Sequence, residues 1–135
     1  MTDTHAPAPL VFIYDRCATQ YQEELVERIA RCQEYAREHR WEIAGSWTDF
    51  ADDALSARRP QWYSMADQMA RFAAGRPVVC LVPDWHRISH DAATRQDLCR
   101  AVRMAGGHCE TLAGQTDTWA GTCARRTPPP PSSVA

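Results

Sequence analysis

Apolar residues occur along the chain in short runs that alternate with longer amphipathic segments. Residues 10–14 and 77–82 form continuous apolar runs, which are typical of strands covered on both faces in a parallel sheet. Residues 41–47 alternate weakly between apolar and polar positions and predict another strand that ends at Asp49. A last short strand is predicted at residues 108–113.

Three segments between these strands carry apolar residues at helical spacing. The first extends from Thr19 to about His39. The second starts at Pro60, which the first turn of a helix tolerates, and ends at Gly75. The third is capped by Asp91 and stopped by a glycine pair. The positions predicted to face the core are Leu25, Ile29, Cys32, Ala36, Trp62, Met65, Met69, Phe72, Leu98, Val102 and Ala105.

This alternation of strands and helices predicts an α/β fold. We expect a single domain over residues 10–118, with a mostly parallel sheet of about four or five strands flanked by helices. Residues 1–9 are predicted to form a disordered leader, and residues 119–135 a proline-rich disordered tail. The polar stretch at 50–57 is predicted to be a loop.

Composition narrows the class of protein. Hydrophobic content is 44%, and no apolar run approaches the roughly 20 residues that span a bilayer. The start of the chain does not resemble a signal peptide, so we expect a cytoplasmic protein. A net charge of −2 argues against strong non-specific DNA binding. All 15 basic residues are arginine, a bias typical of GC-rich genomes such as those of actinobacteria.

The six cysteines are scattered and include no Cys-x-x-Cys pair. We interpret them as reduced thiols, several of them used as small core residues. Because no two have the close spacing of metal ligands, we expect neither a zinc site nor any other cofactor.

Charged residues follow several of the predicted strands. In an open α/β sheet, ligands bind beyond the carboxyl ends of the strands. Residues 15–16, Asp49 and residues 84–90 all fall at such ends, and Arg58 and Arg59 follow in the next loop. Arginine binds phosphate or carboxylate in a bidentate manner, so this rim is a candidate anion pocket.

Several short motifs occur in an order that resembles the catalytic domain of serine recombinases (resolvases and invertases). Tyr14-x-Arg16 matches the family's opening Tyr-x-Arg-x-Ser, and Gln22 matches a glutamine four residues after the serine. Asp49 matches the aspartate that closes the second strand. Arg59-Pro60 matches the head of the next helix, and residues 84–91 resemble Asp-x-Asp-Arg-Leu-Ser-Arg-Asp. The resemblance covers residues 10–113.

The resemblance implies a DNA phosphodiester as substrate, attacked by serine without a metal ion. It also implies that Arg16, Arg59 and Arg87 grip the phosphate and that Asp49 orients an arginine. Three positions depart from the family. Ala18 occupies the position of the nucleophilic serine, His86 replaces the second aspartate of the signature, and His90 replaces its final arginine. A methyl group cannot attack phosphorus, so we predict a recombinase fold without recombinase chemistry.

Two further features leave an enzymatic alternative open. Thr19 has a hydroxyl beside the vacant position, although Thr19 and Gln22 also fit a helix capping box. His86 and His90 are four residues apart, as in some zinc sites, although both can equally reflect drift at altered positions. The alternative is therefore an enzyme that acts on DNA or on a small phosphorylated or acidic substrate through Thr19 or the histidine pair.

We predict that the protein is a binding or regulatory module, and we favour this prediction over the enzymatic alternative. The family's dimerisation helix and DNA-reading region are not evident after residue 113, so we expect weak or no DNA binding by the chain alone. The expected partner is another recombinase-like protein, a different protein or an anionic ligand, and the expected state is a monomer or weak dimer. A third possibility is a decaying fragment without a selected role. The arginines at the rim have a structural interpretation as well as anion binding. They can form ion pairs with Asp15, Asp49 and Asp84.

Overall fold

A computed structural model of the chain describes residues 7–19 and 22–117. Within this part, four strands form one sheet in the order β2-β1-β3-β4, and each neighbouring pair is parallel. The strands are β1 (Leu10–Cys17), β2 (Glu42–Phe50), β3 (Val78–Val82) and β4 (His108–Thr111). The predicted α/β class and parallel sheet are confirmed. The predicted disordered leader and tail fall almost entirely outside the described residues.

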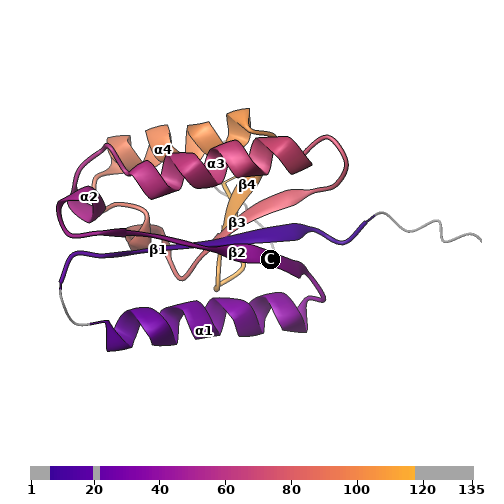
Figure 1. Ribbon diagram of the computed structural model, residues 1–135, viewed down its shortest axis with the longest axis horizontal. Coiled ribbons are helices and arrows are strands. Elements are labelled where there is room, and N and C mark those ends of the chain that lie inside the picture. Colours follow the sequence, from indigo (N-terminus) through magenta and orange to yellow (C-terminus); the bar gives the residue numbers. More distant parts are fainter. Residues whose placement is uncertain (1–6, 20–21, 118–135) are drawn as a thin grey trace, which may run out of the picture.

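Helices cover both faces of this sheet (Figure 1). Helix α1 (Glu23–Glu38) lies on one face, and α3 (Pro60–Phe72) and α4 (Ala92–Met104) lie on the other. Two shorter elements follow the carboxyl ends of strands, namely α2 (Asp52–Leu55) after β2 and the 3₁₀ turn η1 (Trp85–Arg87) after β3. Parallel neighbouring strands require crossover connections, which place helices on the faces of the sheet and bury its central strands.

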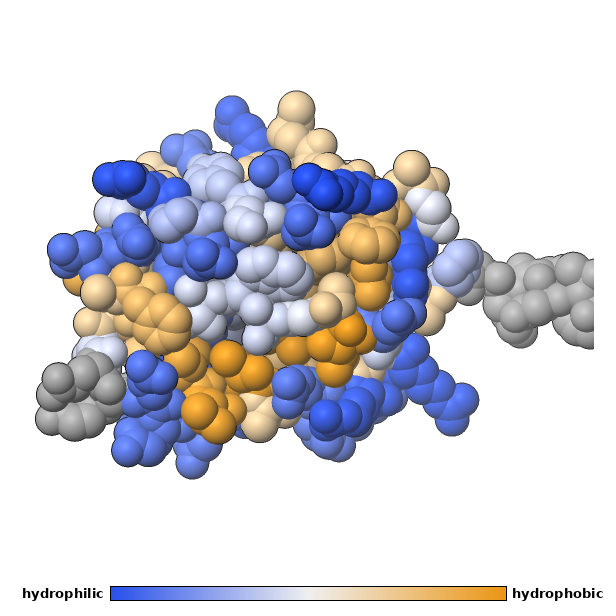
Figure 2. All heavy atoms as spheres, in the orientation of Figure 1, coloured by the Kyte–Doolittle hydropathy of each residue, from blue (hydrophilic) through white to orange (hydrophobic). Residues whose placement is uncertain are grey.

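Strand β1 supplies both hydrophobic cores. Phe12 and Tyr14 pack toward α3 and α4, whereas Val11 and Ile13 pack toward α1. Successive side chains in a strand point to opposite faces, so one continuously apolar strand serves two layers. Figure 2 shows hydrophilic residues over the two helical layers and apolar residues gathered mainly between them.

The predicted helix at residues 19–39 is wrong at its start. Helix α1 begins at Glu23, its N-cap is Gln22, and no side chain caps it, so the capping box of Thr19 and Gln22 is absent. Glu23 and Glu24 instead place negative charge at the positive end of the helix dipole. The core-facing residues of α1 predicted from the spacing are confirmed, since Leu25, Cys32 and Ala36 are buried and Ile29 packs against them.

Three other features differ from the sequence prediction, namely the end of a strand, a short helix in a predicted loop and the exposure of one residue. Strand β1 continues to Cys17 because β2 pairs with it as far as Phe50. The predicted loop at 50–57 contains α2. Phe72, predicted to be a core residue, is 46% exposed because it ends α3, although its ring still contacts Phe12.

Asp91 caps α4 as predicted, and this contact gives a test of stability against pH. Its carboxylate accepts hydrogen bonds from the backbone N and hydroxyl of Thr94, and these bonds lower the pKa of Asp91. The stabilisation is therefore present above the usual value of 3.8 and is lost as pH falls through the lowered pKa. We expect Asp91→Ala to lower Tm at neutral pH, with the difference from wild type vanishing in acid. Thermal denaturation from pH 7 down to about pH 2 measures this, with Asp97→Ala on the same helix as control.

Among the described residues, no helix is both long enough and apolar enough to cross a membrane.

Candidate functional site

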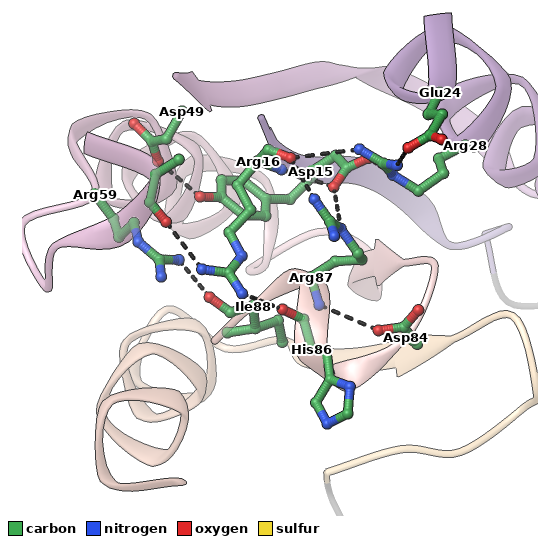
Figure 3. A network of polar contacts seen from close by, with 12 residues as sticks. Asp15, Arg16, Glu24, Arg28, Asp49, Arg59, Asp84, His86, Arg87 and Ile88 are labelled. Carbon is green, nitrogen blue, oxygen red and sulfur yellow. Dashed lines mark hydrogen bonds and ion pairs between the residues drawn. The ribbon is translucent and has the colours of Figure 1, made fainter. Parts of the chain in front are cut away.

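The carboxyl ends of β1, β2 and β3 meet at one edge of the sheet, where α2 and η1 also lie. Arg16 on β1 is the register partner of Asp49 on β2, which brings the two predicted site residues together. Figure 3 shows Arg16, Arg59 and Arg87 converging there from three different segments. The predicted gathering of arginines at this rim is therefore present in the structure.

Arg16 and Arg59 are buried and are held by backbone carbonyls. Arg16 donates to the carbonyl of Ala54 in α2 over 3.0 Å and to that of His86 in η1 over 2.6 Å. Arg59 donates to the carbonyls of Ser56 (2.7 Å) and Ile88. Each guanidinium thus ties the α2 segment to the η1 segment, and Figure 3 shows the bonds from Arg16 to His86 and from Arg59 to Ile88.

Neither of these two buried guanidiniums forms an ion pair with a carboxylate in the described part of the chain. In addition, the Nε of Arg16 is buried without a hydrogen-bond partner. Burial and the nearby charges of Arg59 and Arg87 lower the pKa of Arg16. Buried charges are normally paired, so this corner of the rim holds positive charge that an anion would neutralise.

Arg87 is arranged differently, because it shares a carboxylate with a residue of α1. One oxygen of Asp15 lies 2.9 Å from the Nε of Arg87, and the other lies 2.5 Å from the Nε of Arg28. The first oxygen also accepts from the backbone N of Arg16, and Asp15 is 1% exposed. The sequence pairs Arg28 with Glu24 four residues earlier, a contact of 3.8 Å, and gave no sign of its closer contact with Asp15.

Asp49 makes structural contacts, and none of its hydrogen bonds in the described part of the chain is with an arginine. Its carboxylate accepts from the hydroxyl of Tyr14 (2.8 Å) and from the backbone N of Gln61 (2.8 Å) and Trp62 (3.1 Å). It therefore caps the start of α3 from a neighbouring strand. Burial, reinforced by Asp49, raises the pKa of Tyr14, so its phenol stays protonated and donates to Asp49.

The backbone around α2 is strained on both sides. Ala51 and Arg59 have φ values of 56° and 38°, which residues other than glycine rarely adopt. Such strain persists only where surrounding contacts fix it, and it is common at functional sites. At Arg59 these contacts are the hydrogen bonds from its guanidinium to the carbonyls of Ser56 and Ile88.

Other predicted site residues lie at the surface. Ala18 and Thr19 are exposed directly after β1, and the carbonyl of Thr19 lies 3.2 Å from the Sγ of Cys17. Gln22 is exposed at the start of α1, and Arg58 is exposed before α3. Cys17 is buried, as predicted, on the α1 side of β1.

His86 and His90 lie side by side at the outer edge of the rim. Their ring centroids are 4.9 Å apart, and both residues are exposed. The charge of Arg16 is the main cause that lowers the pKa of His90. The described residues bring no third metal ligand close to this pair.

Comparison with solved structures supports a resolvase-like α/β fold. The chain is similar to a resolvase family site-specific recombinase from Streptococcus pneumoniae (TM-score 0.65, 21% identity), over 82% of this chain and 77% of that one. It is also similar to the N-terminal catalytic domain of TP901-1 integrase (TM-score 0.62, 20% identity), over 83% and 84% of the two chains. The C-terminal catalytic domain of ISC1926 TnpA, an IS607-like serine recombinase, matches with a TM-score of 0.62 and 17% identity, over 76% and 69%.

Comparison with protein-family models and with curated proteins gives no match. The chain therefore has the fold of serine recombinase catalytic domains, at a sequence identity that shows the fold alone.

Proposed function

We propose that the protein is a non-catalytic, recombinase-like module that binds an oxyanion of the phosphate class at the buried arginines. The observation that carries the proposal is the pair Arg16 and Arg59, which are buried and have no carboxylate partner among residues 7–19 and 22–117. The Nε of Arg16 has no hydrogen-bond partner among these residues either. A tetrahedral oxyanion offers several acceptor oxygens for such donors.

The absence of catalysis follows from the chemistry of position 18. Ala18 lies at the end of β1, where the resemblance places the attacking serine. Loss of a nucleophile reduces a rate by several orders of magnitude, and His90 replaces a further arginine. Anion binding requires neither of these groups, so it can persist where strand cleavage cannot.

The binding test uses inorganic phosphate and sulfate with the purified chain. We expect saturable binding by calorimetry or by NMR shifts at the rim. Arg16→Met is expected to weaken affinity by at least about tenfold, which corresponds to ~1.4 kcal/mol. His90→Ala, an exposed change that spares the fold, is expected to weaken it less. Arg37→Met on the far end of α1 serves as control. Unsaturable binding, or equal affinity in all variants, contradicts the proposal.

The same site predicts a pH dependence. The positive neighbour Arg16 lowers the pKa of His90, whereas a bound anion favours the imidazolium. Sulfate affinity should therefore rise as pH falls below the usual histidine value of 6.5, and His90→Ala should flatten this rise. Sulfate is the better probe because its charge is constant over this range. An affinity that is independent of pH in the wild type would contradict the placement of the anion near His90.

The enzymatic alternative is tested with nicked duplex DNA. Because Thr19 is exposed beside Ala18, its hydroxyl is the group to examine. We expect no covalent protein–DNA adduct on denaturing gels for the wild type. An adduct that disappears in Thr19→Ala would overturn the non-catalytic assignment.

A further inference from the structure

We propose a second site, unrelated to the arginine rim, at which Cys99, Cys109 and Asp117 bind a thiophilic divalent cation of the zinc class. The ligand atoms of these three side chains all lie within 4.8 Å of one another. The inference goes beyond the proposed function, since it involves other residues and another chemistry. Spacing along the chain gave no sign of it, because the ligands come from separate elements.

The sheet and α4 bring the two thiols together. Cys109 on β4 is the register partner of Cys80 on β3, so both side chains point to the same face of the sheet. Helix α4 covers this face and contributes Cys99. Cys80, Cys99 and Cys109 are buried in the same core cluster, and the Sγ atoms of Cys99 and Cys109 lie within 4.8 Å of each other. Three thiols from three elements therefore meet in one small region of the core.

The turn after β4 brings the carboxylate of Asp117 back beside Cys109. The backbone N of Asp117 donates to the carbonyl of Cys109 over 3.1 Å, and one carboxylate oxygen of Asp117 accepts from the N of Cys109 over 2.6 Å. The other oxygen lies 2.8 Å from Arg103 on α4. The carboxylate is thus fixed at the edge of the core, with 12% of its side chain exposed, which gives an ion a route inward.

These donors fit zinc better than calcium or magnesium, which prefer oxygen ligands. Zinc lies about 2.3 Å from sulfur and 2.0–2.2 Å from carboxylate oxygen, so tetrahedral ligand atoms are roughly 3.5–3.8 Å apart. A contraction of about 1 Å would bring this group to that geometry. The fourth position goes to water or to Cys80, the nearest further thiol.

Charge and protons balance at this site. Binding replaces the S–H protons of Cys99 and Cys109, which pass to solvent, and forms two metal–sulfur bonds and one metal–oxygen bond. Two thiolates, one carboxylate and a divalent cation sum to −1, which the adjacent Arg103 offsets. Burial raises the pKa of Cys109, so the thiols are protonated until a cation displaces the protons.

The test is a titration of the full chain with Zn²⁺ and with Co²⁺, whose thiolate complexes absorb in the near ultraviolet. We expect one ion per chain, a thiolate-to-cobalt band and a higher Tm with Zn²⁺, with two protons released per ion if water completes the site and three if Cys80 does. Cys99→Ser and Cys109→Ser should each lower affinity at least about tenfold and weaken the band. Cys17→Ser and Cys32→Ser are matched controls, because both thiols are buried away from α4 and should leave binding unchanged.

Further variants keep the test decisive. If a core serine variant fails to fold, Asp117→Asn at the edge should weaken affinity while the sulfur band remains. Cys80→Ala distinguishes thiol from water at the fourth position, since only a thiol ligand would make it weaken the band. Cys123→Ser should have no effect. Absence of a band, or dependence on Cys123 in place of Cys99 and Cys109, would overturn the proposal.

Discussion

Asp15→Asn is expected to destabilise the protein by about 3–5 kcal/mol in buffer without phosphate or sulfate. Asp15 is the only carboxylate in the described part of the chain that pairs with either Arg28 or Arg87 at less than 3 Å. Removing one partner from a buried ion pair leaves the other charge without compensation, which costs more than the pair itself contributes. Here Arg87 loses its carboxylate partner in the described part of the chain, and Arg28 keeps only its 3.8 Å contact with the exposed Glu24.

An added oxyanion should reverse part of this loss. The side chains of Arg28 and Arg87 are 15% and 24% exposed, so we expect a small anion to reach them once the carboxylate charge is gone. We expect phosphate or sulfate to raise Tm more in Asp15→Asn than in the wild type. Asp53→Asn, an exposed change in α2, is the control and should resemble the wild type.

The measurement is denaturant and thermal unfolding with and without 50 mM-scale phosphate at constant ionic strength, that is, roughly the range where a millimolar site fills. A fall in Tm without any differential effect of phosphate would assign Asp15 a purely structural role. The proposed anion site at Arg16 and Arg59 would be left unchanged.

Asp49→Ala is expected to cost about 4 kcal/mol, a large share of the stability of a domain of this size. The change removes the acceptor for Tyr14 and for two backbone donors at the start of α3. Hydrogen bonds to a charged group contribute roughly 1.5–3 kcal/mol each, and the buried donors then have no replacement. Asp49→Asn should cost less, because its amide oxygen retains one acceptor.

Urea unfolding of both variants measures this effect, with Asp67→Ala on the exposed face of α3 as control. If Asp49→Ala and Asp67→Ala have equal stability, Asp49 is not the cap of α3. The anion affinity should change less than the stability, because Asp49 contacts α3 and Tyr14 in place of an arginine.

The two proposed sites bind ions of opposite charge, an oxyanion at the rim and a divalent cation under α4. At the rim, Arg16, Arg59 and Arg87 converge, and Ala18 carries no nucleophilic atom. Under α4, thiols and a carboxylate gather without any counterpart in the motifs that suggested the family. Failure of one proposal leaves the other intact, since no residue is shared between the two sites.

The sequence by itself determined the layered architecture and the alanine at position 18. The side chains of the apolar runs at 10–14 and 77–82 are removed from water only where both faces of the strand are covered. These runs therefore specify buried parallel strands. Helical spacing likewise specified which side of α1 is buried. The identity of residue 18 is a covalent fact and needs no folding to be known.

Only the tertiary structure decided which groups the charged and sulfur-bearing residues contact. Arg16 bonds to carbonyls 38 and 70 residues away, and nothing in local periodicity encodes partners at such distances. The start of α1 was missed because Thr19 and Gln22 fit a local capping pattern that the chain does not use. Hydrophobic periodicity reports which face of an element is buried, whereas hydrogen bonds and metal ligands depend on which elements the fold places side by side.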